Sequence, residues 1–250
     1  MKNIFLVVLF FWLTSAHLAA QETVTPIRFD FNHADELSEW RLGGFPGGGR
    51  DIIDGSFVIS APTNAGASSL FDIDHSDLFV ESQIRFLEDH PRVDWGSLSI
   101  RDLEIGNGVD GYFGAVSSTG DLLLARLLPG VGVDPVVQAA ASGFDALDED
   151  LKMRLVADGS SIDLFAWPAT ESMPPEPQLS IEDDRYSAGS FIALGNTSYA
   201  PVGSASPVAF RYVQISPVPE PNTGMLAFVG FIAFVLRLRG SGRSRHGSVR

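Results

Sequence analysis

Acidic side chains are the first candidates for chemistry in this sequence. Glycoside hydrolysis uses two carboxyl groups, one as general acid and one as nucleophile, about 5 Å apart on one face. Glu81 and Glu88 are seven residues apart, which places them on opposite faces of an extended strand. Asp102 and Glu104 share a face, but the surrounding sequence IRDLEIGNG is typical of a strand end that enters a loop. We therefore predict no catalytic residues and expect that the protein is not an enzyme.

Clustered acids are also candidates for a metal site. Asp72, Asp74 and Asp77 are close in sequence around an expected turn, and further acids occur at 145–150 and 183–184. Calcium needs six to eight oxygen ligands, and the glycine-bent EF-hand loop that supplies them is absent here. Asp72, Asp74 and Asp77 remain candidate ligands of a structural calcium ion, with a solvated acidic face as the alternative. No other cofactor is expected.

Aromatic rings are candidates for carbohydrate binding, because the apolar face of a sugar can stack on a ring. Trp95 follows a polar turn at residues 90–94, which favours an exposed ring. Arg92 and Asp94 lie beside it and offer polar contacts. We predict a glycan site at Trp95, Arg92 and Asp94. The other large rings, which we expect in the core, are Trp40, Tyr112 and Trp167.

The charge distribution limits the classes of partner. The chain has a net charge of −14. Without Lys2, Glu220 and the five arginines after residue 236, 11 basic and 30 acidic residues remain, a net charge of −19. Binding to nucleic acid or to anionic lipid needs a basic face, so both are excluded as partners of this part of the chain. The chain has no cysteine, so its core alone must stabilise it.

The elements that position these residues are expected to be strands. Alternation with a period of two predominates from Ile27 onward, and no sustained helical stripe occurs before residue 218. Asp54-Gly55, Thr119-Gly120-Asp121 and Asp158-Gly159-Ser160 are predicted turns. The expected strands are 27–31, 51–54, 56–60, 78–87, 95–101, 111–117, 122–128, 151–157, 162–167, 179–182, 191–194 and 208–215.

Three glycine- or proline-rich segments are predicted to interrupt the strands. Residues 43–49 are expected to form a loop or a bulged edge, and 168–177, with four prolines, an exposed loop. Small residues, glycine and proline at 129–143 predict a loose loop. About a dozen short strands separated by such turns indicate an all-β sandwich.

The two ends of the chain differ from this middle part. Residues 1–20 combine Lys2, an apolar run and small residues up to Ala20, which predicts a secretory signal peptide. Sixteen uncharged residues lie between Glu220 and Arg237, and a hydrophobic helix is expected at about 223–236. The basic tail at 237–250 would place the C-terminus on the cytoplasmic side.

Pro219, Glu220 and Pro221, followed by a hydrophobic segment and by Arg237 and Arg239, resemble the PEP-CTERM sorting signal. This resemblance implies an exported precursor anchored in the membrane by the C-terminal helix. It also implies that an exosortase-type enzyme cuts near the motif and delivers the protein to the cell envelope or extracellular matrix. The alternative is an ordinary tail anchor.

The central part resembles concanavalin A-like or laminin G-like jelly rolls. The resemblance rests on Gly111-Tyr112-Phe113 through Leu124, on Leu151–Leu155 with Asp158-Gly159, on residues 184–194 and on the closing strand Ala209–Ile215. Arg211 stands where many relatives have an acidic residue after the closing phenylalanine, which argues against a metal role there. We expect a jelly-roll domain at 21–217 followed by a sorting tail at 218–250.

These expectations lead to three hypotheses about function. The first is an exported module that binds extracellular polysaccharide without cleaving it. The second is a glycoside hydrolase or lyase that acts on the exopolysaccharide. The third is a structural matrix protein with no specific ligand. The fold alone does not decide among them, because jelly rolls host all three classes.

Overall fold

The computed structural model describes residues 25–44, 48–62, 65–87, 93–105, 108–128, 132–198 and 206–218. Thr25–Val218 form a unit with its own core. The expected signal peptide, the sorting motif, the hydrophobic helix and the basic tail lie outside the described residues. Within the ranges described, no helix is long and apolar enough to cross a membrane.

Two antiparallel sheets build this unit. Sheet A contains, in spatial order, β13 (Leu179–Glu182), β12 (Ser161–Pro168), β11 (Leu151–Asp158), β6 (Leu78–Phe86), β15 (Ser206–Pro217), β4 (Ser56–Ala61) and β3 (Gly49–Ile53), with β1 (Ile27–Phe29) paired to β15. Sheet B contains β10 (Gly132–Ala141), β9 (Asp121–Leu128), β8 (Gly108–Ser117), β7 (Asp94–Ile105), β14 (Gly189–Ser198), β5 (Ala65–His75) and β2 (Arg41–Gly44).

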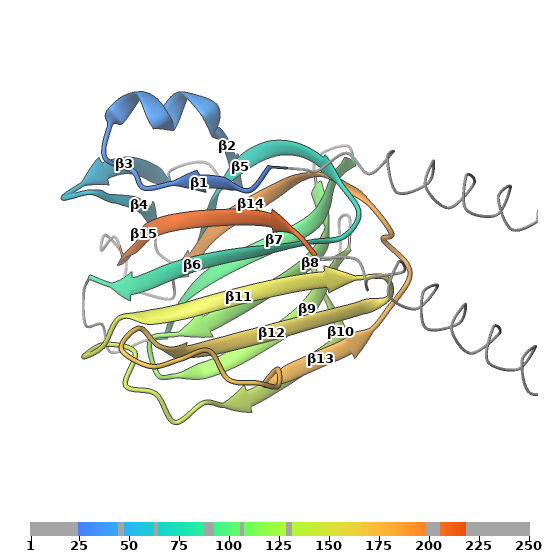
Figure 1. The fold of residues 1–250 in the computed structure, drawn as a ribbon. Helices are drawn as coiled ribbons and strands as arrows, with labels where there is room; N and C mark the ends of the chain where they lie inside the picture. The colour runs from blue at the N-terminus through green and yellow to red at the C-terminus, as the bar shows by residue number, and fades with distance from the viewer. Residues whose placement is uncertain are drawn as a thin grey trace, which may run out of the picture. The chain divides into compact units, whose positions relative to one another are not determined.

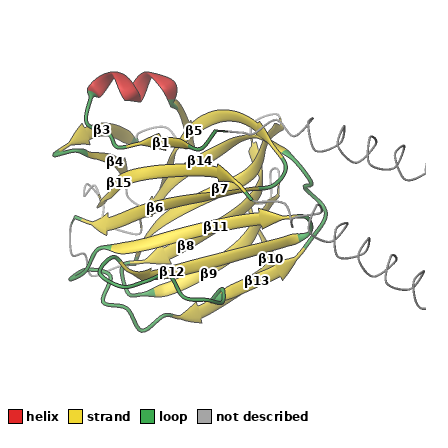
Figure 2. Cartoon of the chain, in the orientation of Figure 1, coloured by secondary structure: helices red, strands yellow, loops and turns green. Residues whose placement is uncertain are grey.

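The sheets pack face to face. In Figure 1 sheet A faces the viewer and sheet B lies behind it. The fold is a jelly-roll β-sandwich, as the strand pattern predicts. Figure 2 shows one short helix among the described residues, next to β3.

Alternating side chains explain why β6 and β11 lie at the centre of sheet A. Every second residue of β6 is buried, beginning at Leu78, and the same holds for β11, beginning at Leu151. Met153 on β11 pairs with Ser82 on β6. Because partners in an antiparallel pair share a face, the two apolar sets lie together between the sheets.

The predicted turns are present. Asp54 and Gly55 have φ angles of 49° and 69°, the left-handed pair that suits a two-residue turn between β3 and β4. Gly159 has a φ of 57° at the turn between β11 and β12. The glycine-rich segment includes the end of β2 and the start of β3, which are both edge strands. Neither strand shows a register shift in its described pairing, so no bulge is present in that part.

The loop predicted at 129–143 is wrong for most of its length. Residues 132–141 form β10, which pairs with β9 at the edge of sheet B. Its register shifts between Val133 and Val137, around Pro135. An edge strand tolerates proline because one of its sides has no ladder partner, and a bulge absorbs the missing N–H. The proline therefore marks an edge strand and not a loop.

Three further elements were not predicted, namely β2, β5 and a 3₁₀-helix. β5 runs through Asp72 and Asp74, so these acids lie on a strand and not around a turn. The polar segment before Trp40 contains a 3₁₀-helix, Ala34–Glu39. The Glu36 carboxylate accepts hydrogen bonds from the backbone N–H groups of Phe31, Asn32 and His33, at 3.0, 3.0 and 3.1 Å. A side chain that satisfies backbone donors at a helix start stabilises the helix without an apolar stripe.

Candidate functional site

The candidate site lies on the outer face of sheet B, where Trp95 meets the turn between β8 and β9. Trp95 on β7 is half-buried and pairs with Ser117 on β8 and with Thr197 on β14. Its neighbours Gly96 and Leu98 are buried. A pocket of about 340 Å³ is lined by Trp95, Asp121 and Ala139–Ala141. The ring therefore forms one wall of an open pocket.

Hydrogen bonds at this turn position Asp121, the polar residue that lines the pocket. The Ser117 hydroxyl lies 2.9 Å from the Thr119 hydroxyl and accepts a hydrogen bond of 2.8 Å from the backbone N–H of Asp121. The Thr119 hydroxyl donates to the Asp121 carboxylate at 3.0 Å. Asp121 is exposed. Its free lone pairs can accept hydrogen bonds from a ligand hydroxyl next to the Trp95 ring.

The turn is held in place by the segment after β10. Gly120 has a φ of 80°, and a Cβ at this position would lie 2.3 Å from the Phe144 carbonyl oxygen. The Ser142 backbone N–H donates to the Gly120 carbonyl at 2.9 Å. Glycine is thus required both for the backbone conformation and for the close approach of residues 142–144. Asp121 is positioned by this packing.

Small side chains form the floor beside Trp95. Ser97, two residues along β7 from Trp95, pairs with Ala115 on β8 and with Gly195 on β14. A Cβ at Gly195 would lie 2.4 Å from the Ser97 hydroxyl oxygen. A row of such residues leaves the sheet surface flat, which suits the approach of a ring-shaped ligand to the indole.

Asp94, which was also predicted at the glycan site, does not line the pocket. Asp94 is fully buried, and its backbone carbonyl accepts a hydrogen bond of 2.8 Å from Ser118. A buried carboxylate cannot contact a ligand on the surface, so the prediction for Asp94 needs correction. It failed because Asp94 begins β7 and does not end an exposed loop. Arg92 lies outside the described residues.

Two of the three acids predicted to bind calcium, Asp72 and Asp77, have protein partners. Arg41 forms an ion pair of 2.7 Å with Asp72. One oxygen of Asp77 accepts from Arg101 at 2.7 Å and from the backbone of Gly159 at 2.9 Å. In the part of the chain that the structure describes, no three acidic or histidine side chains gather as metal ligands. The structure therefore does not support a single ion bound by Asp72, Asp74 and Asp77.

The structure describes the surroundings of two of the acids weighed for catalysis, Glu81 and Asp102. Glu81 on β6 is 8% exposed and accepts hydrogen bonds from Arg154 at 2.8 Å and from the Tyr212 hydroxyl at 2.6 Å. Burial, together with this carboxylate, raises the pKa of Tyr212. Glu81 lies in sheet A, whereas Asp102 is buried in sheet B. Glu88 lies outside the described residues.

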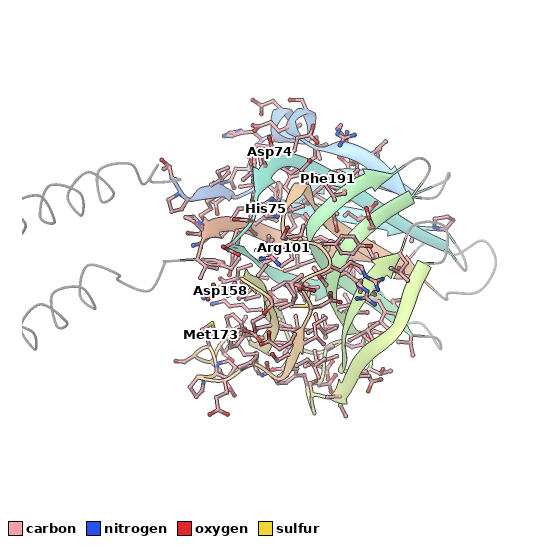
Figure 3. The ribbon with its side chains drawn as sticks, turned by 90° about the vertical axis from the view of Figure 1, so that its right-hand side faces the viewer. Asp74, His75, Arg101, Asp158, Met173 and Phe191 are labelled. Atoms are coloured by element: carbon pink, nitrogen blue, oxygen red, sulfur yellow. The ribbon has the colours of Figure 1, made fainter. Side chains whose placement is uncertain are left out.

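His75 and Arg101 join β5 to β7. Figure 3 shows them close together, near Phe191. The Arg101 backbone N–H donates to His75 Nε2 at 3.1 Å, and His75 Nδ1 lies 2.8 Å from the Ile73 carbonyl oxygen. The imidazole is therefore neutral, with its proton on Nδ1. Burial lowers the pKa of His75, and the Arg101 charge also lowers it, whereas the Ile73 carbonyl, Asp74 and Asp77 oppose the shift.

The His75 pKa predicts a loss of stability in acid. The folded pKa lies below the unfolded value of 6.5, so the unfolded chain binds the proton more tightly. The stabilising contribution is complete above pH 6.5 and is lost as the pH falls from there towards the folded pKa. We expect the free energy of unfolding, measured with urea, to fall less between pH 7 and pH 5 in His75→Gln than in wild type. Equal pH dependence of the two proteins would contradict this assignment.

Comparison with known protein families gives a match to the C-terminal segment. Residues 217–239 match the family described as the PEP-CTERM protein-sorting motif. The chain carries a PEP-CTERM sorting signal. This confirms the predicted motif at Pro219, Glu220 and Pro221. No curated protein matches the chain.

Solved structures resemble the sandwich. A CBM66 carbohydrate-binding module from Bacillus subtilis is 15% identical, with a TM-score of 0.53, and covers 71% of this chain and 95% of its own. A Bacillus subtilis protein of unknown function with a galectin-like fold is 14% identical, with a TM-score of 0.57 and coverages of 78% and 97%. The Bacillus licheniformis β-glucanase is 11% identical, with a TM-score of 0.57 and coverages of 79% and 100%. At such identities the likeness establishes the jelly-roll fold alone.

Asp121 and Ala139–Ala141 were not predicted as site residues. The sequence pattern could have pointed to Asp121, because this residue directly follows the turn glycine Gly120 and begins a strand. No sequence feature indicated the three alanines, because they lie in the segment predicted as a loop. Their position next to Trp95 results from the strand order of sheet B, which local sequence patterns do not predict.

Proposed function

We propose that this protein is an exported precursor, sorted to the cell envelope or matrix by an exosortase-type enzyme, whose sandwich binds polysaccharide without cleaving it. The PEP-CTERM motif supports the sorting step. The observation that carries the binding step is the pocket on sheet B, which Trp95 and Asp121 both line. A ring for stacking beside a hydrogen-bond acceptor is the usual composition of a sugar site.

The composition of the pocket favours binding over hydrolysis. Asp121 is the one carboxylate among its lining residues, whereas glycoside hydrolysis needs two about 5 Å apart. The net charge of −19 between the two chain ends, together with Asp121 at the pocket, favours an uncharged polymer as the ligand.

Trp95→Ala tests the site directly. We expect this variant of residues 25–218 to be retained at least tenfold less than wild type on the producing strain's exopolysaccharide, because loss of a stacked ring removes about 1.5 kcal/mol or more. The matched control is Phe165→Ala, which removes a half-buried ring from β12 in the other sheet. Affinity electrophoresis in gels that contain the polymer measures both.

The retention experiment has three possible outcomes. Reduced retention of Trp95→Ala alone supports the proposal. Equal retention of both variants and wild type removes Trp95 from the site. No retention of the wild type on any glycan favours the structural matrix protein, the third hypothesis.

Processing by an exosortase-type enzyme predicts a shorter mature chain. Intact-mass analysis of protein purified from the envelope or matrix should show loss of residues 1–20 and of the residues after about Pro221. Retention of Arg250 in the mature material would indicate a tail anchor instead.

A further inference from the structure

The sorting signal joins the sandwich at the end of the last strand. The family match begins at residue 217, which is also the last residue of β15. Pro217 pairs with Leu78, the first residue of β6, and the Val218 N–H donates to the Asp77 carbonyl at 3.4 Å. The sorting signal therefore leaves the sandwich where β6 begins (Figure 1). We call the surface formed by Asp77, Leu78 and Val218 the attachment end.

An ion pair between the sheets relates the glycan pocket to the attachment end. Arg101 on β7 pairs with Asp77 at 2.7 Å, so this part of β7 belongs to the attachment end. Trp95 precedes Arg101 by six residues on the same strand. Because a strand rises about 3.3 Å per residue, the Trp95 backbone lies about 20 Å along the strand from Arg101.

A second contact between the sheets gives the same separation independently. A Cβ on Gly96, the residue after Trp95, would lie 3.0 Å from a side-chain carbon of Ile84 and 3.0 Å from one of Val208. Ile84 follows Leu78 by six residues along β6. The backbone beside Trp95 therefore lies opposite a point about 20 Å along β6 from its first residue.

The other pocket residues lie at the same far end of sheet B as Trp95. Asp121 is the first residue of β9 and pairs with Ala141, the last residue of β10. Ser117, which pairs with Trp95, is the last residue of β8. The pocket is thus built from strand ends at the opposite end of the sandwich from the attachment end.

We propose that the precursor binds polysaccharide while its sorting signal is still attached, and so links the membrane to the extracellular polymer. This inference rests on the proposed function, because it uses the Trp95 pocket as the sugar site. A membrane or a processing enzyme at the attachment end leaves a pocket about 20 Å away free to bind. Polymer binding therefore does not need release of the domain, and cleavage ends the link.

Attachment to one membrane also strengthens the hold on the polymer. A polysaccharide presents the same sugar unit many times, so several copies of the precursor can bind one polymer chain. After the first contact the further binding events are intramolecular, and the total avidity exceeds the affinity of one pocket. Cleavage separates the copies and removes this gain.

Vesicles that carry the precursor without its expected signal peptide, residues 21–250, test the proposal. They are mixed with the producing strain's exopolysaccharide, labelled with a fluorophore, and floated on a density gradient. We expect the polymer to float with wild-type vesicles and not with Trp95→Ala vesicles. Phe165→Ala, in the other sheet, is the matched control and should capture as much polymer as the wild type. Soluble residues 25–218 mixed with bare vesicles should leave the polymer at the bottom.

Attachment at chosen positions tests the geometry itself. The chain has no cysteine, so one introduced cysteine couples residues 25–218 to a maleimide lipid at a single position. Ser76→Cys attaches the domain next to Asp77, at the attachment end. Asp145→Cys attaches it one residue after Phe144, whose carbonyl oxygen packs against Gly120 at the pocket. Ser76 and Asp145 are both exposed. We expect Ser76→Cys vesicles to capture several-fold more polymer than Asp145→Cys vesicles.

The possible failures are distinguishable. If soluble residues 25–218 do not bind the polymer, the proposed function fails, and this inference fails with it. If they bind, but vesicles with the precursor or with Ser76→Cys capture no polymer, the inference alone is overturned. Equal capture by Ser76→Cys and Asp145→Cys vesicles also overturns it, because the position of the pocket relative to the attachment point then has no effect. If a cysteine variant does not fold, the precursor vesicles still decide.

Discussion

Trp40→Ala is expected to lower the free energy of unfolding of residues 25–218 by about 3–5 kcal/mol, the usual range for a buried aromatic residue. Trp40 is 1% exposed. Its ring centroid lies 5.4 Å from Phe29, 5.7 Å from Phe57 and 5.4 Å from Phe71. Deletion of the indole leaves a cavity between rings that come from both sheets, since Phe57 belongs to β4 and Phe71 to β5. Urea unfolding followed by circular dichroism measures the change.

Trp40→Phe is the matched control. The Trp40 Nε1 atom has no hydrogen-bond partner among the described residues, so phenylalanine removes volume without breaking a hydrogen bond. We expect this variant to lose clearly less stability than the alanine variant. If Trp40→Ala unfolded at nearly the wild-type urea concentration, the aromatic cluster would not be the main core at this end of the sandwich.

Arg101→Met should have the second largest effect, a loss of about 3 kcal/mol. The side chain is 1% exposed and connects the Ser76 carbonyl, the Tyr186 carbonyl and Asp77. Methionine fills much of the volume but leaves the two carbonyls without this donor. The Asp77 carboxylate is 43% exposed, so water can replace part of its interaction and the loss stays below that of a fully buried pair.

Arg41→Met is the control for this prediction. Arg41 pairs with Asp72, but the two side chains are 44% and 64% exposed, and such pairs contribute about 0–1 kcal/mol. Similar losses in the two variants, measured by urea unfolding, would contradict the assignment of Arg101 as a structural connection between β5, β7 and the Tyr186 segment.

Local patterns were sufficient to predict the fold class and much of sheet A. In β6 and β11 every second residue is buried, because one face of each strand packs against sheet B. The turns at Asp54-Gly55 and Gly159 were predictable because positive φ angles select these residue types. The sorting motif was recognisable because its three parts occur in a fixed order within a short segment.

The strand prediction failed mainly in sheet B, at β10 and β5. β10 contains Pro135, which reads as a loop when the position of the strand within the sheet is unknown. β5 is long and lies beside the edge strand β2, yet its sequence AGASSLFDIDH alternates weakly. Some of its small and polar residues, such as Ser68 and Asp72, are partly or fully exposed. Sequence periodicity reports burial on one face, and this strand gives little of that signal.

The site was predicted in part, for a similar reason. Trp95 was selected for its ring and its polar neighbours, and the structure places it on a pocket. Its sequence neighbour Asp94 points away from the surface, because successive residues of a strand face opposite sides. The position of Asp121 beside the pocket depends on strand pairing. Local spacing in the sequence does not encode that pairing.

The most direct test of the proposed function is one incubation of residues 25–218 with the producing strain's exopolysaccharide. Sedimentation of the polymer measures bound protein, and an assay for reducing ends measures cleavage in the same sample. Binding that weakens in Trp95→Ala, with no increase in reducing ends after long incubation, is the predicted result. A steady release of reducing ends that disappears when a single aspartate or glutamate is substituted would contradict it and identify a glycoside hydrolase.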